Sequence, residues 1–330
     1  MPVCTDSAMG RYIRKTCRFR AMGVMSAPGA WRCLRQLIIV RGMLETVEQS
    51  QTDTRGEAAS FELLAGDPTR GCVIVCDHAS NWLPPAYGSL GLELDELSRH
   101  IAYDIGVAEV TQNLSQLMGV PALLARFSRL LIDPNRGFDD PTLIMQLSDG
   151  AIVPGNANVD AAEIENRRAL YYQPYHDAID AAIDQAIAAG RPPIIVSIHS
   201  FTDSWRGRQR PWQVTVLWDR DPRLPVPLLE ALRLEPDIVV GENVPYSGEL
   251  KGDCLYRHGT QRGLAHALIE IRQDLIRKPA GQREWAERLA RILTQLLSRP
   301  NLAPEQHQIQ YHGSNTDPIQ ADDEPSPNRG

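Results

Sequence analysis

The stretch CVIVCDHASNWLPP, residues 72–85, carries five apolar or thiol residues directly into Asp77 and His78 before a Pro-Pro pair interrupts it. A short apolar run that ends in a turn signal is typical of a strand covered on both faces, as in a parallel sheet. His78 therefore stands at the carboxyl end of this strand. Because ligands of open α/β sheets bind beyond that edge, the stretch indicates both a fold class and the place of a site.

Other apolar runs alternate with helical spacing along the chain. Strands are expected at residues 73–76, 121–125, 194–198, 213–218 and 267–271, and helical stripes at residues 97–108, 172–187 and 285–296. Strands and helices in alternation indicate an α/β domain whose helices cover both faces of a mostly parallel, mixed sheet. The predicted fold class is a three-layer α/β/α sandwich.

The ends of the chain differ from its middle. Residues 1–55 begin with a basic segment that holds eight basic residues and one acid up to Leu44, and we expect a disordered extension or a gene start placed too early, with translation beginning near Met43. An Arg-rich transit peptide is the alternative. Residues 301–330 are polar and rich in Pro, Asn and Asp, which predicts a disordered tail. One catalytic domain is expected over residues 56–300.

Composition limits the possible partners and the compartment. The net charge of −7 and pI of about 5.7 provide no general attraction for nucleic acid or anionic lipid, so a small-molecule or protein partner is expected. Six cysteines without a CxxC pair indicate a reducing, cytoplasmic compartment. Cys72 and Cys76 share a strand face and are expected to be packing residues. No apolar run reaches the length of about 18 residues needed to cross a bilayer.

A second histidine ends a buried strand in the same way. His199 directly follows the run IIVSI at residues 194–198. Two imidazoles at one sheet edge, together with a carboxylate, form the ligand set of a catalytic zinc ion with one position left for water. Either histidine alone is more simply explained as a strand cap that bonds a loop, but the paired placement favours the metal.

Three further segments contain candidate site residues. The Pro-Asn-Arg-Gly turn in RFSRLLIDPNRG, residues 126–137, holds Asn135 and Arg136 beside the sheet, where a guanidinium would suit a carboxylate. Glu270 lies between two isoleucines in a buried strand and must be paired, protonated or functional, with pairing to Arg272 as the alternative. The polar segment 241–263 is long enough to be a lid or a binding loop.

The ordered motifs of the chain resemble those of a known family. They are VIVCDHASNWLPP, HIAYDIG, RFSRLLIDPNRG, YYQPYHDAI, SIHSFTD, RPWQVTVLW, ENVPYSG and IEIRQDLI. In order and approximate spacing they are similar to the N-formylglutamate amidohydrolase family over about residues 70–297. The resemblance extends to zinc carboxypeptidases and aspartoacylase-like deacylases, and it implies a zinc-exopeptidase-like fold with one zinc ion per chain.

The resemblance implies a role for several residues. His78 and His199 would bind zinc, and Glu270 would be the general base. Asn135 and Arg136 would hold a substrate carboxylate.

The third metal ligand departs from the pattern of the wider group. The carboxypeptidase-like pattern has a glutamate three residues after the first histidine, where this chain has Asn81. An amide oxygen is a poor zinc ligand, so Asp104 in HIAYDIG is the preferred candidate. The alternative is that Asp104 is the N-cap of a helix that begins at Ile105.

The implied reaction is hydrolysis of N-formyl-L-glutamate to formate and glutamate. Arg129 is expected to share the charge of the oxyanion, while Tyr246 and Arg262 from the long polar segment are expected to contact the substrate. The alternatives are a zinc amidase for another N-acyl amino acid or short peptide, and an inactive metal-binding relative. The sequence does not specify an oligomeric state.

Overall fold

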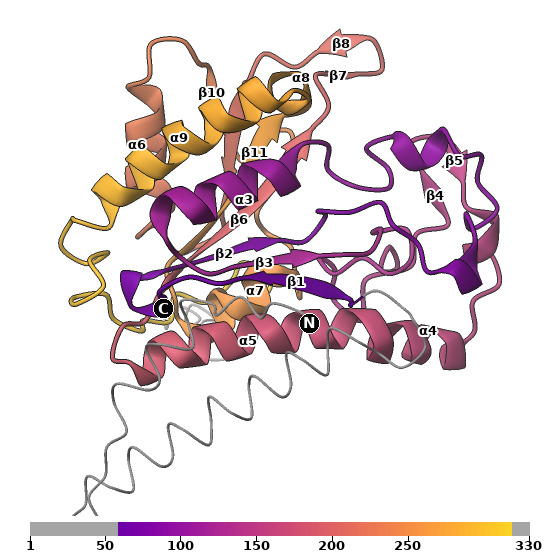
Figure 1. Ribbon diagram of the computed structural model, residues 1–330, viewed down its shortest axis with the longest axis horizontal. Coiled ribbons are helices and arrows are strands. Elements are labelled where there is room, and N and C mark those ends of the chain that lie inside the picture. Colours follow the sequence, from indigo (N-terminus) through magenta and orange to yellow (C-terminus); the bar gives the residue numbers. More distant parts are fainter. Residues whose placement is uncertain (1–58, 319–330) are drawn as a thin grey trace, which may run out of the picture. The chain divides into compact units, whose positions relative to one another are not determined.

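The computed structural model describes residues 59–318 (Figure 1). The expected N-terminal extension, residues 1–55, lies outside the described residues. The strands of the main sheet are β1 Phe61–Leu64, β2 Cys72–Cys76, β3 Ala122–Ala125, β6 Ile194–Phe201, β9 Val214–Leu217, β10 Val240–Glu242 and β11 His266–Arg272. The helices are α3 Val107–Met118, α4 Ala161–Arg167, α5 Gln173–Ala188, α6 Pro225–Arg233, α7 Cys254–His258, α8 Gln273–Ile276 and α9 Pro279–Leu296. Short hairpins are formed by β4 Leu147–Ser148 with β5 Ala151–Ile152, and by β7 Ser204–Trp205 with β8 Arg208–Gln209.

Within the described residues, seven strands form one mixed sheet in the order β1-β3-β2-β6-β11-β9-β10. The central strands β3, β2, β6 and β11 are parallel, whereas β1 pairs antiparallel with β3 and β9 pairs antiparallel with β11. All residues of β2 and β6 are buried, because helices cover both faces of the sheet. The carboxyl ends of β2, β6 and β11 therefore meet at one edge.

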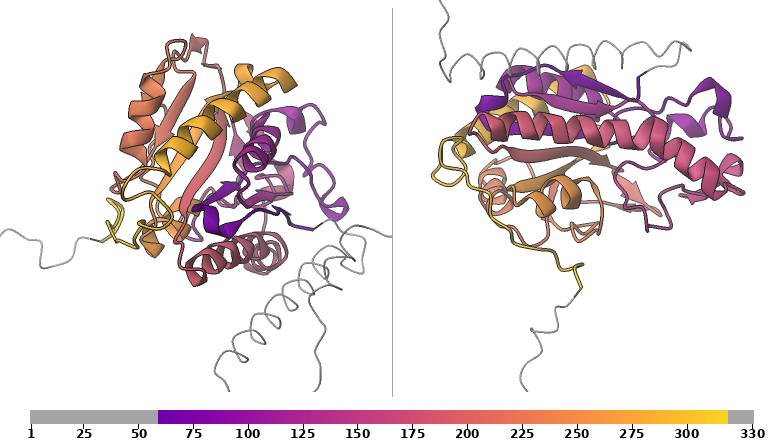
Figure 2. Two further views of the ribbon diagram at one scale, coloured as in Figure 1. Left: turned by 60° about the vertical axis from the view of Figure 1, so that its left-hand side comes forward. Right: turned by 90° about the horizontal axis from the view of Figure 1, so that it is seen from below.

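The helices form two layers around this sheet. Helices α3, α6 and α9 pack on one face, and α5 and α7 pack on the other (Figures 1 and 2). The two faces have separate cores, because alternate side chains of each strand point to opposite sides. The predicted three-layer α/β/α sandwich with a mostly parallel, mixed sheet is thereby confirmed. No helix of residues 59–318 is long and apolar enough to cross a bilayer.

The helical stripe expected at residues 97–108 is wrong over most of its length. Helix α3 begins only at Val107, and the preceding residues form turns. Gly106 fixes this start, since it has a φ of 85° and a Cβ there would approach the Ile276 carbonyl oxygen to 2.2 Å. The other expected helices correspond to α5 and α9, and β1, β10, α3 and α6 were not predicted.

The C-terminal segment also differs from expectation. We expected disorder from residue 301, yet the structure describes residues 301–318 as a segment that lies against the domain. The His307 ring contacts the Pro192 carbonyl oxygen at 2.8 Å and accepts from the Ala265 amide at 3.3 Å. The Tyr256 hydroxyl donates to Asp317 at 2.6 Å. The segment bonds backbone groups that the sheet leaves free, so its polar composition does not prevent packing.

Candidate active site

Two histidines and an aspartate meet at the carboxyl edge of the sheet. His78 stands two residues after the end of β2, His199 lies in the neighbouring strand β6, and their ring centroids are 4.8 Å apart. Asp104, from the turns before α3, places its Oδ2 atom 2.9 Å from Nδ1 of His199 and 3.5 Å from Nδ1 of His78. All three residues are at most 5% exposed. The Nδ1 atoms of both rings therefore point toward one carboxylate.

The outer nitrogens of the same rings contact two other carboxylates. Nε2 of His78 is 2.7 Å from Oδ1 of Asp133, and Nε2 of His199 is 3.1 Å from Oδ2 of Asp77. Carboxylate acceptors at these positions favour a proton on each Nε2 atom and fix the ring orientation. This tautomer leaves Nδ1 of a neutral ring free to bind a metal ion.

Several groups of the site carry a charge. Burial alone would lower the pKa of His199, but hydrogen bonds to Asp104 and Asp77 raise it to about 10. Burial likewise opposes ionisation of the carboxyl groups, yet the adjacent histidines keep the pKa values of Asp77 and Asp104 below their ordinary range. A proton on His199 thus balances carboxylates that a metal cation would also neutralise.

Glu270 lies beside this cluster. It lies on β11 in register with His199 of the parallel strand β6, is 8% exposed, and its Oε2 atom has no hydrogen-bond partner among residues 59–318. Burial raises the pKa of Glu270 to about 7, and the Asp104 charge acts in the same direction against the opposing effect of His199. The alternative pairing with Arg272 is not formed, because Arg272 bonds Asp274 at 2.7 Å. Glu270 is therefore a buried carboxyl group able to hold or accept a proton near neutral pH.

Arg129 connects the cluster to its supporting carboxylate. Its Nε and Nη2 atoms donate to Oδ2 of Asp133 at 3.1 and 2.7 Å. Its Nη1 atom lies 3.2 Å from Nδ1 of His78 and 3.6 Å from Oδ1 of Asp104. The guanidinium thus holds Asp133 in place and brings positive charge to the inner side of the cluster.

A cavity of about 500 Å³ opens above the cluster. Asn135, Arg136 and Tyr246 line it together with the cluster residues and Glu270. Asn135 accepts from the Cys254 amide at 3.1 Å, and Arg136 donates to the Thr142 hydroxyl at 3.1 Å. The volume is in the range of small-molecule sites. The expected residues of the Asn-Arg turn and one expected residue of the long polar segment therefore reach the same space as the histidines.

Two candidate residues lie elsewhere. Arg262 does not line the cavity, since its guanidinium pairs with Asp180 at 2.8 Å and also with Asp184, so its expected role in substrate binding is not supported. Asn81 donates to the Leu97 carbonyl oxygen at 2.8 Å and is not part of the cluster. Asp104, the preferred candidate for third ligand, is a member of it, and its side chain is not a helix N-cap, because Gly106 takes that position.

The sequence analysis missed Asp77 and Asp133 as partners of the histidines. Asp77 precedes His78 in the chain but contacts the other histidine, His199, because adjacent residues at a strand end point in different directions. Asp133 stands two residues before Asn135 and also accepts from its amide at 2.9 Å. The signal in the sequence was a carboxylate within or directly beside each motif that was predicted to form the site.

Comparisons with known proteins place the chain among amidohydrolases. The family model for N-formylglutamate amidohydrolase matches residues 70–277, and the chain belongs to that family. A solved gene product of Agrobacterium tumefaciens is 34% identical with a TM-score of 0.69, and the match covers 75% of this chain and 97% of that one. An N-formylglutamate amidohydrolase from Ralstonia eutropha JMP134 is 23% identical with a TM-score of 0.57, covers 72% and 97% of the two chains, and supports the fold. No curated protein matches the chain.

Proposed function

We propose that the chain is a zinc-dependent amidohydrolase that cleaves N-formyl-L-glutamate to formate and L-glutamate. The observation that carries the proposal is the convergence of the Nδ1 atoms of His78 and His199 on Asp104, next to a carboxyl oxygen of Glu270 that has no partner among the described residues. Membership of the N-formylglutamate amidohydrolase family supports the reaction class and the substrate. The free thiols of Cys72, Cys76 and Cys254 agree with the proposed cytoplasmic location.

The donor set fits zinc. Two imidazole nitrogens and one carboxylate are the ligands of several catalytic zinc sites, whereas magnesium and calcium prefer oxygen ligands. The acceptors on the outer nitrogens, Asp133 and Asp77, are the partners that metal-bound histidines usually have. His78, His199 and Asp104 would therefore hold the ion.

The chain's own residues suit hydrolysis of an amide. Zinc would supply a Lewis acid for the formyl oxygen and would lower the pKa of a water molecule. Glu270 would accept a proton from that water and deliver it to the departing amine, since a pKa of about 7 allows both transfers near neutral pH. Arg129 would stabilise negative charge on the formyl oxygen. The formyl group is small, so the cavity walls with Asn135, Arg136 and Tyr246 would recognise the amino acid portion.

The test is formate release from N-formyl-L-glutamate by the zinc-loaded protein and by the His199→Ala variant. We expect the variant to lose activity, because a ligand and the link to Asp77 are both removed. His307→Gln is the matched control, since His307 is a buried histidine that bonds backbone groups and does not line the cavity. Wild-type activity in His199→Ala would contradict the proposal.

A further inference from the structure

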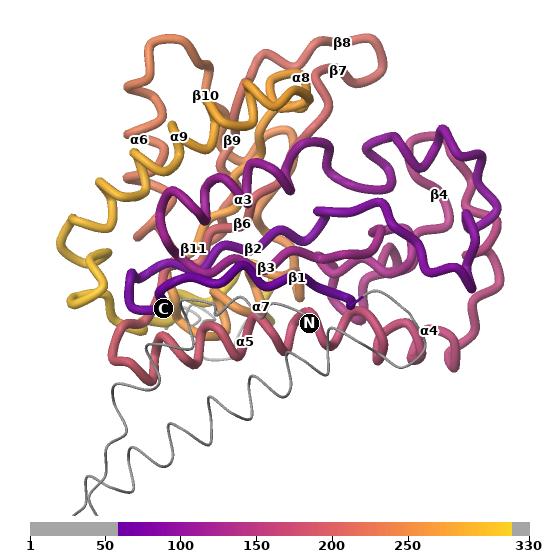
Figure 3. Tube along the Cα trace, in the orientation of Figure 1, coloured from indigo at the N-terminus to yellow at the C-terminus, as the bar shows by residue number. Residues whose placement is uncertain are grey.

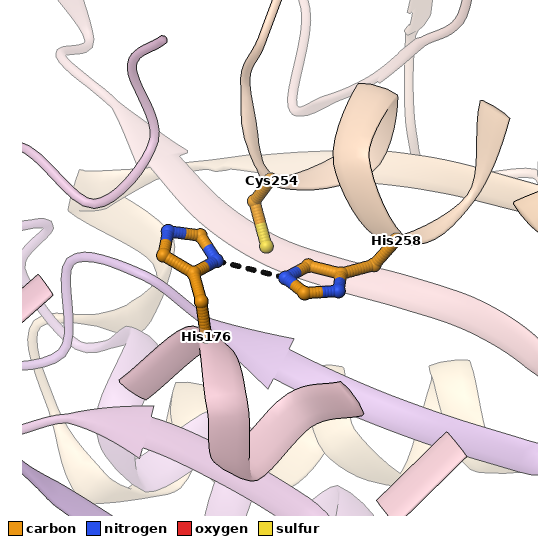
Figure 4. A group of neighbouring side chains, drawn as sticks. All are labelled: His176, Cys254 and His258. Carbon is orange, nitrogen blue, oxygen red and sulfur yellow. Dashed lines mark hydrogen bonds between the residues drawn. The ribbon is translucent and has the colours of Figure 1, made fainter. Parts of the chain in front are cut away.

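A second cluster of metal-ligand side chains lies outside the cavity. His176 comes from α5, and Cys254 and His258 come from the first and last residues of α7. All three are 0% exposed, and their ligand atoms lie within 4.8 Å of one another. Figure 4 shows the Cys254 sulfur pointing toward the gap between the two imidazole rings. None of the three lines the cavity above Glu270.

The hydrogen bonds of the two rings require more protons than neutral rings carry. Nε2 of His176 contacts Pro134 O at 3.0 Å, Nδ1 of His176 contacts Nε2 of His258 at 2.8 Å, and Nδ1 of His258 contacts Asp180 Oδ1 at 3.0 Å. Each contact needs one proton, and two neutral imidazoles supply two. The carbonyl and the carboxylate only accept, so the outer nitrogens take these protons. The inner nitrogens then face each other with lone pairs.

Burial supports the neutral form of one ring. Burial and the adjacent His258 keep the pKa of His176 well below its ordinary value. A neutral imidazole is the form that binds metal ions. The Pro134 and Asp180 acceptors on the outer nitrogens have the same relation to this pair that Asp133 and Asp77 have to the active-site histidines.

We propose that His176, Cys254 and His258 bind a second metal ion of a thiophilic kind, zinc(II) or copper(I). One sulfur and two imidazole nitrogens without a carboxylate are a donor set that such ions prefer over magnesium or calcium. The ion would occupy the place between the inner nitrogens and would satisfy both lone pairs with neutral rings. Metal binding would displace the proton of the Cys254 thiol, through which the thiol donates a hydrogen bond to Asp77 in this structure.

The position of the cluster assigns it a structural role. Helix α7 lies in the long polar segment between β10 and β11, as the chain trace shows (Figure 3). The flanking residue Asp253 and the α7 residues Leu255 and Tyr256 line the active-site cavity. An ion shared by α5 and α7 would therefore fix one wall of that cavity to the underlying helix.

The experiment uses the full-length chain with Cys4, Cys17 and Cys33 replaced by serine, so that N-terminal thiols contribute no signal. Zinc and copper are counted per chain by elemental analysis, and the chelator-stripped protein is then reloaded with cobalt(II). We expect two metal ions per chain, of which one remains in His78→Ala/His199→Ala and one remains in Cys254→Ser. We also expect a near-ultraviolet band from thiolate bound to cobalt, lost in Cys254→Ser and kept in the matched buried-cysteine variant Cys72→Ser.

The outcomes separate this site from the active site. Loss of the band in Cys254→Ser with one remaining metal ion supports the proposal, and the element found identifies the ion. Should Cys254→Ser fail to fold, His176→Gln makes the same test, since it removes a nitrogen ligand and keeps the thiol. A stripped wild-type background that takes up cobalt without a thiolate band overturns the proposal, as does a His78→Ala/His199→Ala protein that folds without metal. If only the proposed active-site metal proved absent, the thiolate band from the second site would still be observed.

Discussion

Replacement of Glu270 by glutamine should abolish turnover and, in the metal-free protein, raise stability. Glutamine is nearly isosteric with glutamate but cannot accept a proton, so loss of a positioned base should lower formate release by about 10²- to 10⁴-fold while zinc remains bound. The stability effect follows from burial, since one oxygen of ionised Glu270 has no partner in the described part of the chain. Replacement of a residue that only supports the fold would instead lower the stability of the protein.

The magnitude follows from the pKa of Glu270. Burial raises it from 4.5 to about 7, and one unit of pKa corresponds to about 1.4 kcal/mol, so ionising Glu270 costs the folded protein about 3 kcal/mol. The folded state holds the proton more tightly than the unfolded state. The stability associated with protonated Glu270 is therefore fully present below pH 4.5 and is lost as the pH rises through about 7. The variant should gain about 2 kcal/mol relative to wild type between pH 5.5 and 8.5.

Urea unfolding of the chelator-stripped proteins across this pH range measures the effect. Glu287→Gln, an exposed position on α9, is the matched control and should follow wild type at every pH. A constant difference in unfolding free energy between Glu270→Gln and wild type would show that Glu270 does not titrate in this window. Near wild-type formate release by Glu270→Gln would refute its role as the base.

Two other predictions follow from the contacts around the site and at the C-terminus. Asp133→Asn should weaken zinc binding about 10- to 100-fold in a chelator competition, because Nε2 of His78 loses its carboxylate acceptor, whereas Asp139→Asn, on the exposed side of the same turn, should not. Truncation after residue 300 should destabilise the protein by about 2–4 kcal/mol in urea unfolding, since buried Leu302 and the His307 hydrogen bonds are lost. Truncation after residue 318 should retain stability, and equal stability of both truncations would contradict the observed packing.

The sequence predicted the parts of the site that local patterns determine. His78 and His199 were found because each stands at the carboxyl end of a buried apolar run, and Glu270 because a charge between isoleucines is unusual in a buried strand. Asp104 was found as a carboxylate, although the helix assigned to it was wrong. The apolar spacing before α3 is helical, but left-handed Gly106 delays the helix to Val107.

Partners that are distant in sequence were beyond such patterns. Asp77 and His199 are 122 residues apart, and their contact exists because β2 and β6 are neighbours in the sheet. The assignment of Arg262 to the cavity failed for a related reason, since the fold brings Asp180 to its guanidinium instead. Composition misjudged residues 301–318, because a polar segment can pack through hydrogen bonds to backbone groups such as the Pro192 carbonyl.

The charges of the cavity lead to a prediction about substrate choice. Arg129 is already engaged by Asp133. Among residues 59–318, Arg136 donates closely only to a hydroxyl and a carbonyl oxygen and has Asp140 at 3.7 Å, with 21% of its side chain exposed. Arg136 can therefore turn toward a substrate carboxylate with little loss. Every formyl amino acid carries an α-carboxylate, so we expect Arg136→Ala to lower kcat/KM by about 2 kcal/mol, roughly 30-fold, for N-formyl-L-glutamate and N-formyl-L-methionine alike.

A preference for glutamate over methionine would then rest on other groups at or behind the cavity wall. Tyr246 lines the cavity, and its hydroxyl lies 3.4 Å from two nitrogens of Arg210, a buried residue behind the wall whose positive charge would favour a side-chain carboxylate at Tyr246. Arg210→Met should therefore lower kcat/KM for N-formyl-L-glutamate and leave that for N-formyl-L-methionine nearly unchanged, while Arg262→Met should change neither. Formate release from both substrates is the assay. If Arg210→Met affected both substrates equally, the side-chain carboxylate would have to bind elsewhere. If the wild-type protein cleaved both substrates equally well, the preference for a dicarboxylate would be refuted, while the amidohydrolase assignment would stand.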